Sequence, residues 1–476
     1  MLGNPLNGNA KAFAGKILQK LYPEAAGEQT DISFTTSFSE EHFSKIEIDN
    51  ILKRFPRSKA PGFDGIDSVI VWNIHSNFPE LLATFMNKCL DLKKFPTPFK
   101  TGLIVLFHKK GREKNSITSY RPISLLPILG KLLEKLLLQR VSFTINKQNV
   151  LHPYQFGFRE GKSSTHALRK LSDVIEDAKK REHYVIVISL DIQGTLDNLK
   201  YGIIRKELRK LFTKSNISET LEDILSNLKV AIQTSDGPAV WKETQGCPQG
   251  SCNSPLFWNV VADEILKTDW AKEIHLQAFA DDFAFVISGR TRRELKLHTS
   301  ITLESFKNWT DKNQFDISLE ESQYLLIGKL SKGPVVRWRS QPIKRTTSLK
   351  YLGVILDEKL NWFSHIQEQG AKAVSQYQHL CRIAGPRWGL KQKYKRILYQ
   401  TVTERMLLYG ASAWALSFSP KLEKKLSSIQ RIFLLYITCS YRTTPTAALQ
   451  TITGIIPLHL KAQQEAIFIN VTCLRK

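Results

Sequence analysis

Residues 183–190 form a nearly continuous apolar run that is rich in β-branched side chains, and the run stops at Asp191. Such a run is typical of a strand whose two faces are both covered. Two more apolar runs, 274–280 and 283–287, are separated only by Asp281-Asp282, which is the spacing of a two-residue hairpin. The sequence therefore predicts a buried sheet in which carboxylates lie where strands end.

Strand and helix patterns alternate along the rest of the chain. Residues 1 to about 40 mix Gly, Asn, Thr and Ser with one short amphipathic run, and we interpret them as a leader or linker. After Trp362 helical spacings replace strand patterns, so the chain as a whole fits an α+β fold. The remaining patterns predict helices near 46–55, 81–90 and 128–141 and strands at 101–107 and 349–356.

The charge balance indicates a polyanionic partner. The 476 residues include 68 Lys and Arg against 44 Asp and Glu, a formal net charge of +24. Half of the excess falls in residues 365–476, which hold 16 Lys and Arg against four Glu. A basic excess concentrated in one part of a folded chain favours nucleic acid, with an anionic membrane as the second candidate.

Other classes of protein are excluded by what the sequence lacks. No stretch approaches the ~20 apolar residues that a membrane helix needs, and the N-terminus has no secretory signal pattern. The six cysteines show no paired short spacing of a zinc site, so we expect free thiols in a reducing compartment. The sequence therefore predicts an intracellular protein with no membrane partner, and it does not indicate an oligomeric state.

A Gly- and Pro-rich loop, residues 245–255 (QGCPQGSCNSP), lies between the two acidic strand ends. Ser254 is the expected N-cap of a following helix, with Pro255 as its first residue. Gly246 and Gly250 carry no side chain, so the backbone there can approach a base and sugar closely. The loop is equally consistent with a tight connection that binds nothing.

The acidic strand ends have the chemistry of a magnesium site if their strands are neighbours. Polymerases use two Mg²⁺ ions ~3.5–4 Å apart to stabilise the attacking and leaving oxygens of phosphoryl transfer. Each ion needs only one or two carboxylates, because substrate phosphates and waters complete its coordination. Asp191 and Asp281 fit this requirement, although a single Asp is more often a helix cap or a turn residue.

Seven short motifs follow one another in a specific order along about three hundred residues. This order resembles that of the reverse transcriptases of non-LTR (LINE-like) retrotransposons, of the jockey and R1 type, and RTTPTAAL at 442–449 resembles the segment after their thumb. The motifs are PGFDGI (61–66), SYRPISLLPILGKLLEK (119–135), HPYQFGFREGKSSTHAL (152–168), LDIQGTLDN (190–198), QGCPQGSCNSPLFWN (245–259), FADD (279–282) and KYLGVILD (350–357).

The resemblance implies an α+β right-hand polymerase with fingers, a palm built on an antiparallel sheet, and a helical thumb. It predicts an N-terminal leader and the start of the fingers at 1–90, the reverse transcriptase domain (fingers and palm) at 91–357, and a basic helical thumb and C-terminal segment at 358–476. The implied activity is RNA-directed DNA synthesis from dNTPs, which extends a DNA primer on an RNA template with Mg²⁺ or, alternatively, Mn²⁺.

The same resemblance assigns site residues motif by motif. Asp191, Asp281 and Asp282 resemble the palm carboxylates that catalyse the reaction and hold the metal ions, with Asp191 and Asp281 as direct ligands and Asp282 as adjacent support. The expected nucleotide-binding residues are Arg121, Leu196, Gln249 and Gly250. The expected template- and primer-binding residues are Gly157, Phe158, Arg159, Tyr351, Leu352 and Gly353. Taken without the resemblance, Arg121 also fits an ordinary surface cation, residues 157–159 fit a Gly-aromatic turn with a solvated Arg, and residues 351–353 fit a plain strand.

Two positions depart from the family pattern. Where the family has Ala-Phe-Asp, with a ring that blocks a ribose 2′-hydroxyl, this sequence has Thr195-Leu196-Asp197. Where the family has a lysine that protonates the leaving pyrophosphate, this sequence has Glu321 in the run 317–322. General acid help of this kind contributes ~10²–10⁴ in rate. Two functions therefore stay open: an active polymerase, or a decayed, catalytically weak copy that binds RNA or RNA/DNA hybrid.

The chain has no endonuclease pattern before these motifs and no Cys/His knuckle after them, so we expect a truncated copy of an element protein. A nuclear location is expected from the resemblance, although no compact basic run signals it. An RNA-templated RNA polymerase shares the palm carboxylates but fits the YRPIS and FADD contexts poorly.

Overall fold

Contacts in the computed structural model divide the chain into two compact units. The first unit comprises Met1–Phe158, Ile192–Thr268 and Trp309–Asp316, and the second comprises Arg159–Asp191, Asp269–Asn308 and Ile317–Lys476. The residues that the structure describes are 10–23, 38–111, 113, 119–212, 214–328, 330, 333–385, 388–416 and 419–473.

The first unit contains a four-stranded sheet of order β2-β1-β4-β5. β1 pairs antiparallel with β2 and parallel with β4, and β4 pairs antiparallel with β5. The strand predicted at 101–107 is confirmed as β1. The strands are β1 (Thr101–His108), β2 (Tyr120–Leu125), β4 (Lys229–Ile232) and β5 (Ala239–Lys242).

Helices make up most of the rest of the first unit. The helices predicted near 46–55, 81–90 and 128–141 are confirmed as α2, α4 and α5. Ser44 and Glu47 form a capping box that starts α2. The helices are α1 (Ala10–Leu21), α2 (Lys45–Lys53), α3 (Ser68–Asn77), α4 (Pro79–Asp91), η1 (Thr97–Lys100), α5 (Ile128–Gln148), α7 (Tyr201–Leu211), α8 (Asn216–Ile224) and α9 (Ser254–Leu266).

Part of the expected leader is a packed helix. α1 contributes Ala14 and Leu18 to a small core that it shares with Val230 of β4 and other strand residues. The indole Nε1 of Trp241, on β5, donates a hydrogen bond of 2.9 Å to the carbonyl of Tyr22. The short amphipathic run seen in the sequence therefore covers β4 and β5.

The second unit contains a five-stranded sheet of order β11-β8-β3-β7-β6. β3 and β6 each pair antiparallel with β7, whereas β11 pairs parallel with β8. The strand predicted at 183–190 is confirmed, and it continues through Asp191. The strands are β3 (Tyr184–Ile192), β6 (Ile274–Phe279), β7 (Asp282–Gly289), β8 (Ile317–Ile327) and β11 (Lys344–Thr346).

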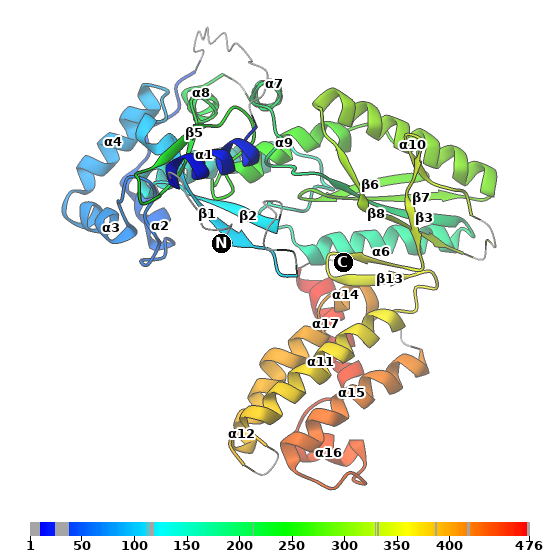
Figure 1. Ribbon diagram of the computed structural model, residues 1–476. Helices are drawn as coiled ribbons and strands as arrows, with labels where there is room; N and C mark the ends of the chain where they lie inside the picture. Colours follow the sequence, from blue (N-terminus) through cyan, green and yellow to red (C-terminus); the bar gives the residue numbers. More distant parts are fainter. Residues whose placement is uncertain are drawn as a thin grey trace. The chain divides into compact units, whose positions relative to one another are not determined.

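Both faces of this sheet are covered, which explains the apolar sequence of β3 (Figure 1). On one face, Phe306 of α10 (Arg292–Asn313) makes edge contacts with Phe283 and Phe285 of β7. On the other face, α6 (Ser164–Lys180) joins the alternate residues of β3 and β7 in one hydrophobic core. Residues that face α10 alternate along the strand with residues that face α6, because successive side chains of a strand point to opposite faces of the sheet.

Two turns differ from their prediction. The β6–β7 turn is Ala280-Asp281 rather than Asp281-Asp282, because Ala280 takes a positive φ of 58° and Asp282 already pairs with Phe279. The strand predicted at 349–356 is a hairpin of β12 (Ser348–Tyr351) and β13 (Val354–Asp357). It reverses at Leu352-Gly353, where both φ values are positive.

The helical pattern predicted after Trp362 is confirmed. A second small hairpin, β9 (Arg337–Trp338) with β10 (Gln341–Pro342), precedes these helices. The helices are α11 (Phe363–Ile383), α12 (Gln392–Leu398), the π-helix η3 (Tyr399–Thr403), α13 (Glu404–Leu407), α14 (Ala411–Trp414), α15 (Pro420–Thr438), α16 (Thr446–Thr453) and α17 (Leu458–Thr472).

The predicted fold class is confirmed: the chain is α+β. The five-stranded sheet, called the palm sheet below, is antiparallel at β3, β7 and β6 and parallel at β11–β8, and helices follow it as in a right-hand polymerase. The core on the α6 face of the palm sheet extends without interruption into α11, α15 and α17. Among the described residues, no helix combines the length and the apolar character needed to cross a membrane.

Candidate active site

Three of the predicted carboxylates meet at one end of the palm sheet. Asp191 is the second-to-last residue of β3, Asp281 lies in the β6–β7 turn, and Asp282 begins β7. In the β3–β7 pairing, Leu190 is opposite Phe283, so the same register continued by one residue places Asp191 opposite Asp282. Paired residues on neighbouring strands have Cα atoms ~4.5–5.5 Å apart. The structure therefore brings together side chains that are about ninety positions apart in sequence.

The carboxylates raise one another's proton affinity. Burial, followed by the negative charges of Glu321, Asp281 and Asp282, raises the pKa of Asp191 to about 6. Partial burial of the carboxyl group and the charge of Asp281 also raise the pKa of Asp282. Carboxylates crowded without a counter-charge repel one another, and a divalent cation reverses that effect. The end of the sheet therefore has the electrostatics of a cation site.

The carboxylate oxygens of Asp191 and Asp281 are of the ligand type that Mg²⁺ prefers. Among the described residues, no group of three or more His, Cys, Asp or Glu side chains is arranged to hold a metal ion. Mg²⁺ requires only one or two carboxylates when phosphates and waters supply its other ligands. Asp191 and Asp281 match that smaller requirement, so a bound substrate would complete the coordination.

Glu321 lies beside Asp191, which the sequence alone did not indicate. β8 is the neighbour of β3, and the backbone N–H of Asp191 donates a hydrogen bond of 3.2 Å to Oγ of Ser322. Glu321 is exposed and Ser322 is buried, and among its neighbours Glu321 is the charge that most raises the pKa of Asp191. The departure from the family pattern thus adds a fourth negative charge to the carboxylate cluster.

The Gly- and Pro-rich loop is held in place by backbone hydrogen bonds within the first unit. The N–H of Cys247 donates to the carbonyl of Leu196 at 2.8 Å, and the N–H of Gly246 donates to the carbonyl of Leu199 at 2.7 Å. Gly246 has a φ of +85°, and a Cβ there would lie 2.6 Å from the carbonyl oxygen of Asp197. Gly246 therefore permits close packing between two segments of the protein.

Gly250 makes a similar close approach to β2. Its φ is +148°, and a Cβ would lie 2.3 Å from the carbonyl oxygen of Ser124. The N–H of Ser124 in turn donates to the carbonyl of Gln249 at 2.9 Å.

The prediction that Ser254 caps the following helix is wrong by one residue, because α9 begins at Ser254 and the flanking residue is Asn253.

Two acidic residues that the sequence analysis did not assign hold this loop. The carboxylate of Glu134, on α5, accepts hydrogen bonds of 2.7 Å from Oγ of Ser251 and from the N–H of Cys252. Burial raises the pKa of Glu134. A single acidic residue within an otherwise apolar helix face is the sequence signal that could have identified it.

Asp197 holds the side chain of Gln249. The amide Nε2 of Gln249 donates to both carboxylate oxygens of Asp197, at 3.0 and 3.3 Å. Burial raises the pKa of Asp197, and the hydrogen bond from Gln249 opposes that shift. The orientation of Gln249 is therefore set by a residue 52 positions away in sequence.

Replacement of Asp197 by Ala is expected to lower the free energy of unfolding of the first unit by about 1–3 kcal/mol, since the amide of Gln249 loses a charged acceptor. Urea unfolding followed by fluorescence measures this change. Asp197→Asn is the matched control, because its amide oxygen still accepts from Gln249 and the loss should be smaller. Equal losses in the two variants would show that this hydrogen bond does not stabilise the loop.

The remaining predicted nucleotide and template residues of the first unit lie on defined elements. Arg121 is exposed on β2, opposite Phe107 of β1, and Leu196 is partly buried. Gly157 is buried, and its carbonyl accepts a hydrogen bond of 3.1 Å from Nδ2 of Asn259. Phe158 follows with a φ of +55° and a side chain that is 57% exposed.

The remaining template and primer residues belong to the second unit. Arg159 is half-buried at the start of that unit. Tyr351 is fully buried, and its hydroxyl accepts a hydrogen bond of 3.1 Å from Nε2 of Gln277, so it is a core residue. Leu352 and Gly353 are partly buried at the β12–β13 turn. The hydroxyl of Tyr409 donates to the carbonyl of Leu352 at 2.9 Å.

Known relatives resemble this chain over most of its length. It is 27% identical over 457 residues to a 115 kDa protein in the type-1 retrotransposable element R1DM of Drosophila melanogaster, covering 95% of this chain and 44% of that protein. It is 28% identical over 460 residues to the retrovirus-related Pol polyprotein from the type-1 retrotransposable element R1 of Bradysia coprophila, covering 95% and 45%.

A further relative is the RNA-directed DNA polymerase from the mobile element jockey of Drosophila melanogaster, which is 25% identical over 390 residues and covers 79% of this chain and 42% of that protein. The chain therefore spans less than half the length of these relatives. The family model described as reverse transcriptase (RNA-dependent DNA polymerase) matches residues 107–356, more than half of the chain. The predicted resemblance to the R1 and jockey type is thus confirmed, and the chain belongs to the reverse transcriptase family.

Proposed function

We propose that this chain is the RNA-directed DNA polymerase part of a non-LTR retrotransposon protein, which extends a DNA 3′ end on an RNA template. The observation that carries the proposal is the meeting of Asp191 with Asp281 and Asp282 at the end of the palm sheet, with the pKa of Asp191 raised to about 6. Family membership supports the same reaction, because the matching family is named for it.

In this proposal, Asp191 and Asp281 hold Mg²⁺, or alternatively Mn²⁺, and Asp282 adds negative charge beside them. When bound, the ions neutralise the triphosphate and stabilise the attacking and leaving oxygens of the displacement. The chain itself contributes ionised carboxylates whose positions are fixed by the pairing of β3 with β7.

Other residues bind and orient the substrates. Arg121 is exposed on β2, and its guanidinium group suits bidentate contact with the phosphates of an incoming dNTP. Gln249 and Gly250 support the nascent base pair from a loop that is fixed by Asp197, and Leu196 lies where the family has its ribose gate. Each of these contacts orients a substrate group before the reaction, which lowers the entropic cost of reaching the transition state.

Template and primer would be held through the backbone and by stacking. The exposed ring of Phe158 offers a stacking surface, with Gly157 and Arg159 on either side. Leu352 and Gly353 present a rigid turn to the primer end, while Tyr351 anchors that turn in the core. Binding should weaken as salt rises, because phosphate contacts release counterions.

A second candidate function is binding of RNA or RNA/DNA hybrid by a catalytically weak copy. The observation that favours it is Glu321, whose negative charge lies beside Asp191 where the family has a cation. Leu196, in place of an aromatic gate, points the same way. Variants that restore Phe at Leu196 and Lys at Glu321 separate the candidates, since a large gain in extension identifies a damaged enzyme.

The test of the proposed function is extension of a labelled DNA primer on an RNA template with dNTPs and Mg²⁺. We expect products whose length follows the template and which disappear when the metal is chelated. Absence of template-dependent product at saturating metal would overturn the proposed activity and leave the binding function as the better account.

Metal binding has a stability signature that does not depend on activity. Asp191 has a folded-state pKa of about 6 against an ordinary 3.8, so the folded chain binds more protons than the unfolded chain between these values. The stability that this group contributes is therefore present below pH ~4 and is lost as pH rises through about 6. Mg²⁺ should offset the loss by binding the ionised carboxylates of the folded state.

Thermal unfolding with and without Mg²⁺ tests this expectation. The metal should raise Tm above pH ~6 and have a smaller effect near pH ~4, where Asp191 is protonated. Asp191→Asn should remove most of the pH-dependent response. A Tm increase of equal size in that variant would place the metal at another site.

A further inference from the structure

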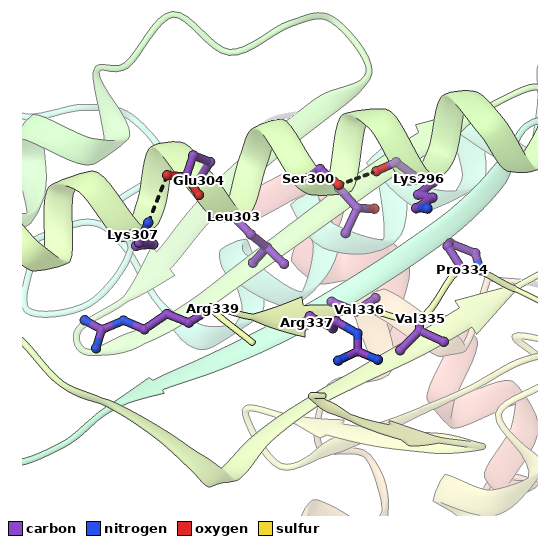
Figure 2. A pocket seen from close by; sticks show the side chains of 11 residues that line it. Lys296, Ser300, Leu303, Glu304, Lys307, Pro334, Val335, Val336, Arg337 and Arg339 are labelled. Atoms are coloured by element: carbon purple, nitrogen blue, oxygen red, sulfur yellow. Dashed lines mark hydrogen bonds and ion pairs between the residues drawn. The ribbon is translucent and has the colours of Figure 1, made fainter. Parts of the chain in front are cut away.

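A cleft with a volume of about 210 Å³ lies between α10 and the β9–β10 hairpin in the second unit (Figure 2). Several of its lining side chains are basic. None of its lining residues belongs to the predicted polymerase site. Figure 2 shows Lys296 and Lys307 on the helix side, and Arg337 and Arg339 on the hairpin side.

The helical periodicity of α10 brings its cleft-lining side chains onto one face. Lys296, Ser300, Leu303 and Lys307 follow one another at spacings of four, three and four residues, so they lie on one face of α10. This face borders the cleft along about three helical turns.

The hairpin side is anchored by a buried ring. Trp338 is 5% exposed and makes an edge contact with Phe306 of α10, with ring centroids 6.0 Å apart. Arg337 precedes Trp338 on β9 and Arg339 follows it in the turn; both are exposed and line the cleft. Arg339 also has a φ of +53°, a backbone conformation that favours Gly or Asn.

The cleft has a clear excess of positive charge. Four basic side chains line it against one acidic side chain, Glu304. Glu304 pairs with Lys307 at 2.9 Å. Nη1 of Arg337 donates to the carbonyl of Ser340 at 2.9 Å, which fixes the guanidinium group at the rim.

We propose that this cleft binds phosphate groups of an RNA backbone, as a contact surface outside the polymerase site. The identity of the anion as RNA rests on the proposed function; the positive charge of the cleft does not. The cleft volume is that of about seven water molecules in the liquid, which is enough for a phosphate group with part of its hydration shell.

Recognition would combine charge with hydrogen bonding. Arg337 and Arg339 suit phosphate oxygens through their planar donor groups, and Lys296 acts as a point charge. A lipid surface is a less favoured partner, because binding to it requires apolar side chains inserted into the interface rather than a recessed polar cleft.

The test compares two charge-reversal pairs in the full chain. Lys296→Glu with Arg337→Glu removes two cleft cations, and Lys179→Glu with Lys180→Glu makes the same change of charge on exposed residues in the last turn of α6. Affinity for a fluorescent single-stranded RNA is measured by anisotropy over a salt series. Thermal unfolding verifies that each variant is folded, and Arg337→Lys should retain binding.

We expect the cleft pair to lose RNA affinity about tenfold, and its salt dependence to become shallower by about 1.4, since each lost phosphate contact on a single strand accounts for about 0.7. The α6 pair should show much smaller changes. Equal losses in both pairs, or no loss in the cleft pair, would overturn the proposal.

Two further arms separate the alternatives. Vesicles of equimolar phosphatidylcholine and phosphatidylserine test a membrane partner, and stronger dependence on the cleft for vesicles than for RNA would overturn the RNA assignment. RNA binding is measured without dNTPs, so it does not require primer extension. Cleft-dependent binding without any primer extension by the unaltered chain would therefore refute the proposed function and leave this inference standing.

Discussion

Replacement of Asp281 by Asn is expected to reduce RNA-templated DNA synthesis by about a thousandfold or more. The carboxylate lies in the β6–β7 turn next to Asp282 and raises the pKa of Asp191, so it shares the local field in which a cation would bind. A metal ion supplies several kcal/mol of transition-state stabilisation, and each 1.36 kcal/mol is tenfold in rate. Single-turnover primer extension measures the chemical step directly.

The Asn side chain preserves the turn, because Asn and Asp are both favoured in tight turns. Asp177→Asn is the matched control: it removes the same charge from the exposed last turn of α6, where the carboxylate pairs with Lys180 at 3.7 Å. That variant should extend primers at the unaltered rate. Retention of activity within tenfold in Asp281→Asn would show that this carboxylate is not a metal ligand.

The palm sheet could be predicted because its strands are recognisable from the local sequence pattern alone. β3 and β7 are covered on both faces, so their sequences are nearly all apolar; Asp191 lies near the end of β3, and Asp282 begins β7. The exact turn could not be predicted, since Ala280 takes a positive φ that its side chain does not favour. A pattern read along the chain fixes which residues are buried more reliably than where the backbone reverses.

The partners that hold the site could not be predicted for a different reason. Glu134 contacts a loop 117 positions away, and the strand that carries Glu321 reaches Asp191 across 131 positions. Local periodicity contains no information on such pairs, so the sequence alone links residue 321 with the leaving pyrophosphate and not with Asp191. The expected boundaries at residues 90 and 357 stay predictions, and each compact unit is assembled from three separate segments of the chain.

Substitution of Glu321 by Lys is expected to increase the rate of extension by about 10²–10⁴, the usual contribution of a positioned general acid. Two effects act together. The substitution removes a negative charge that raises the pKa of Asp191, and it introduces an ammonium group that can donate a proton to the leaving pyrophosphate. Rates measured over a pH series report both.

The direction of the pH effect follows from the charges. Asp191 must be ionised to hold a cation, so extension should fall as pH drops through about 6 in the unaltered chain. In Glu321→Lys the pKa of Asp191 is lowered, and the acid limb of the profile should move to lower pH. Glu320→Lys is the matched control, because the alternation along β8 places Glu320 on the face opposite Glu321, the charge that most raises the pKa of Asp191.

The two variants therefore separate local from global charge effects. If Glu320→Lys gave the same increase in the rate of extension, the increase would come from the added positive charge attracting nucleic acid. The side chain at residue 321 would then have no specific effect on the site. If neither variant changed the rate while Asp281→Asn still abolished it, a defect other than Glu321 would dominate. A gain confined to Glu321→Lys, together with the acid shift, would show that one carboxylate on β8 sets the activity of the palm carboxylates.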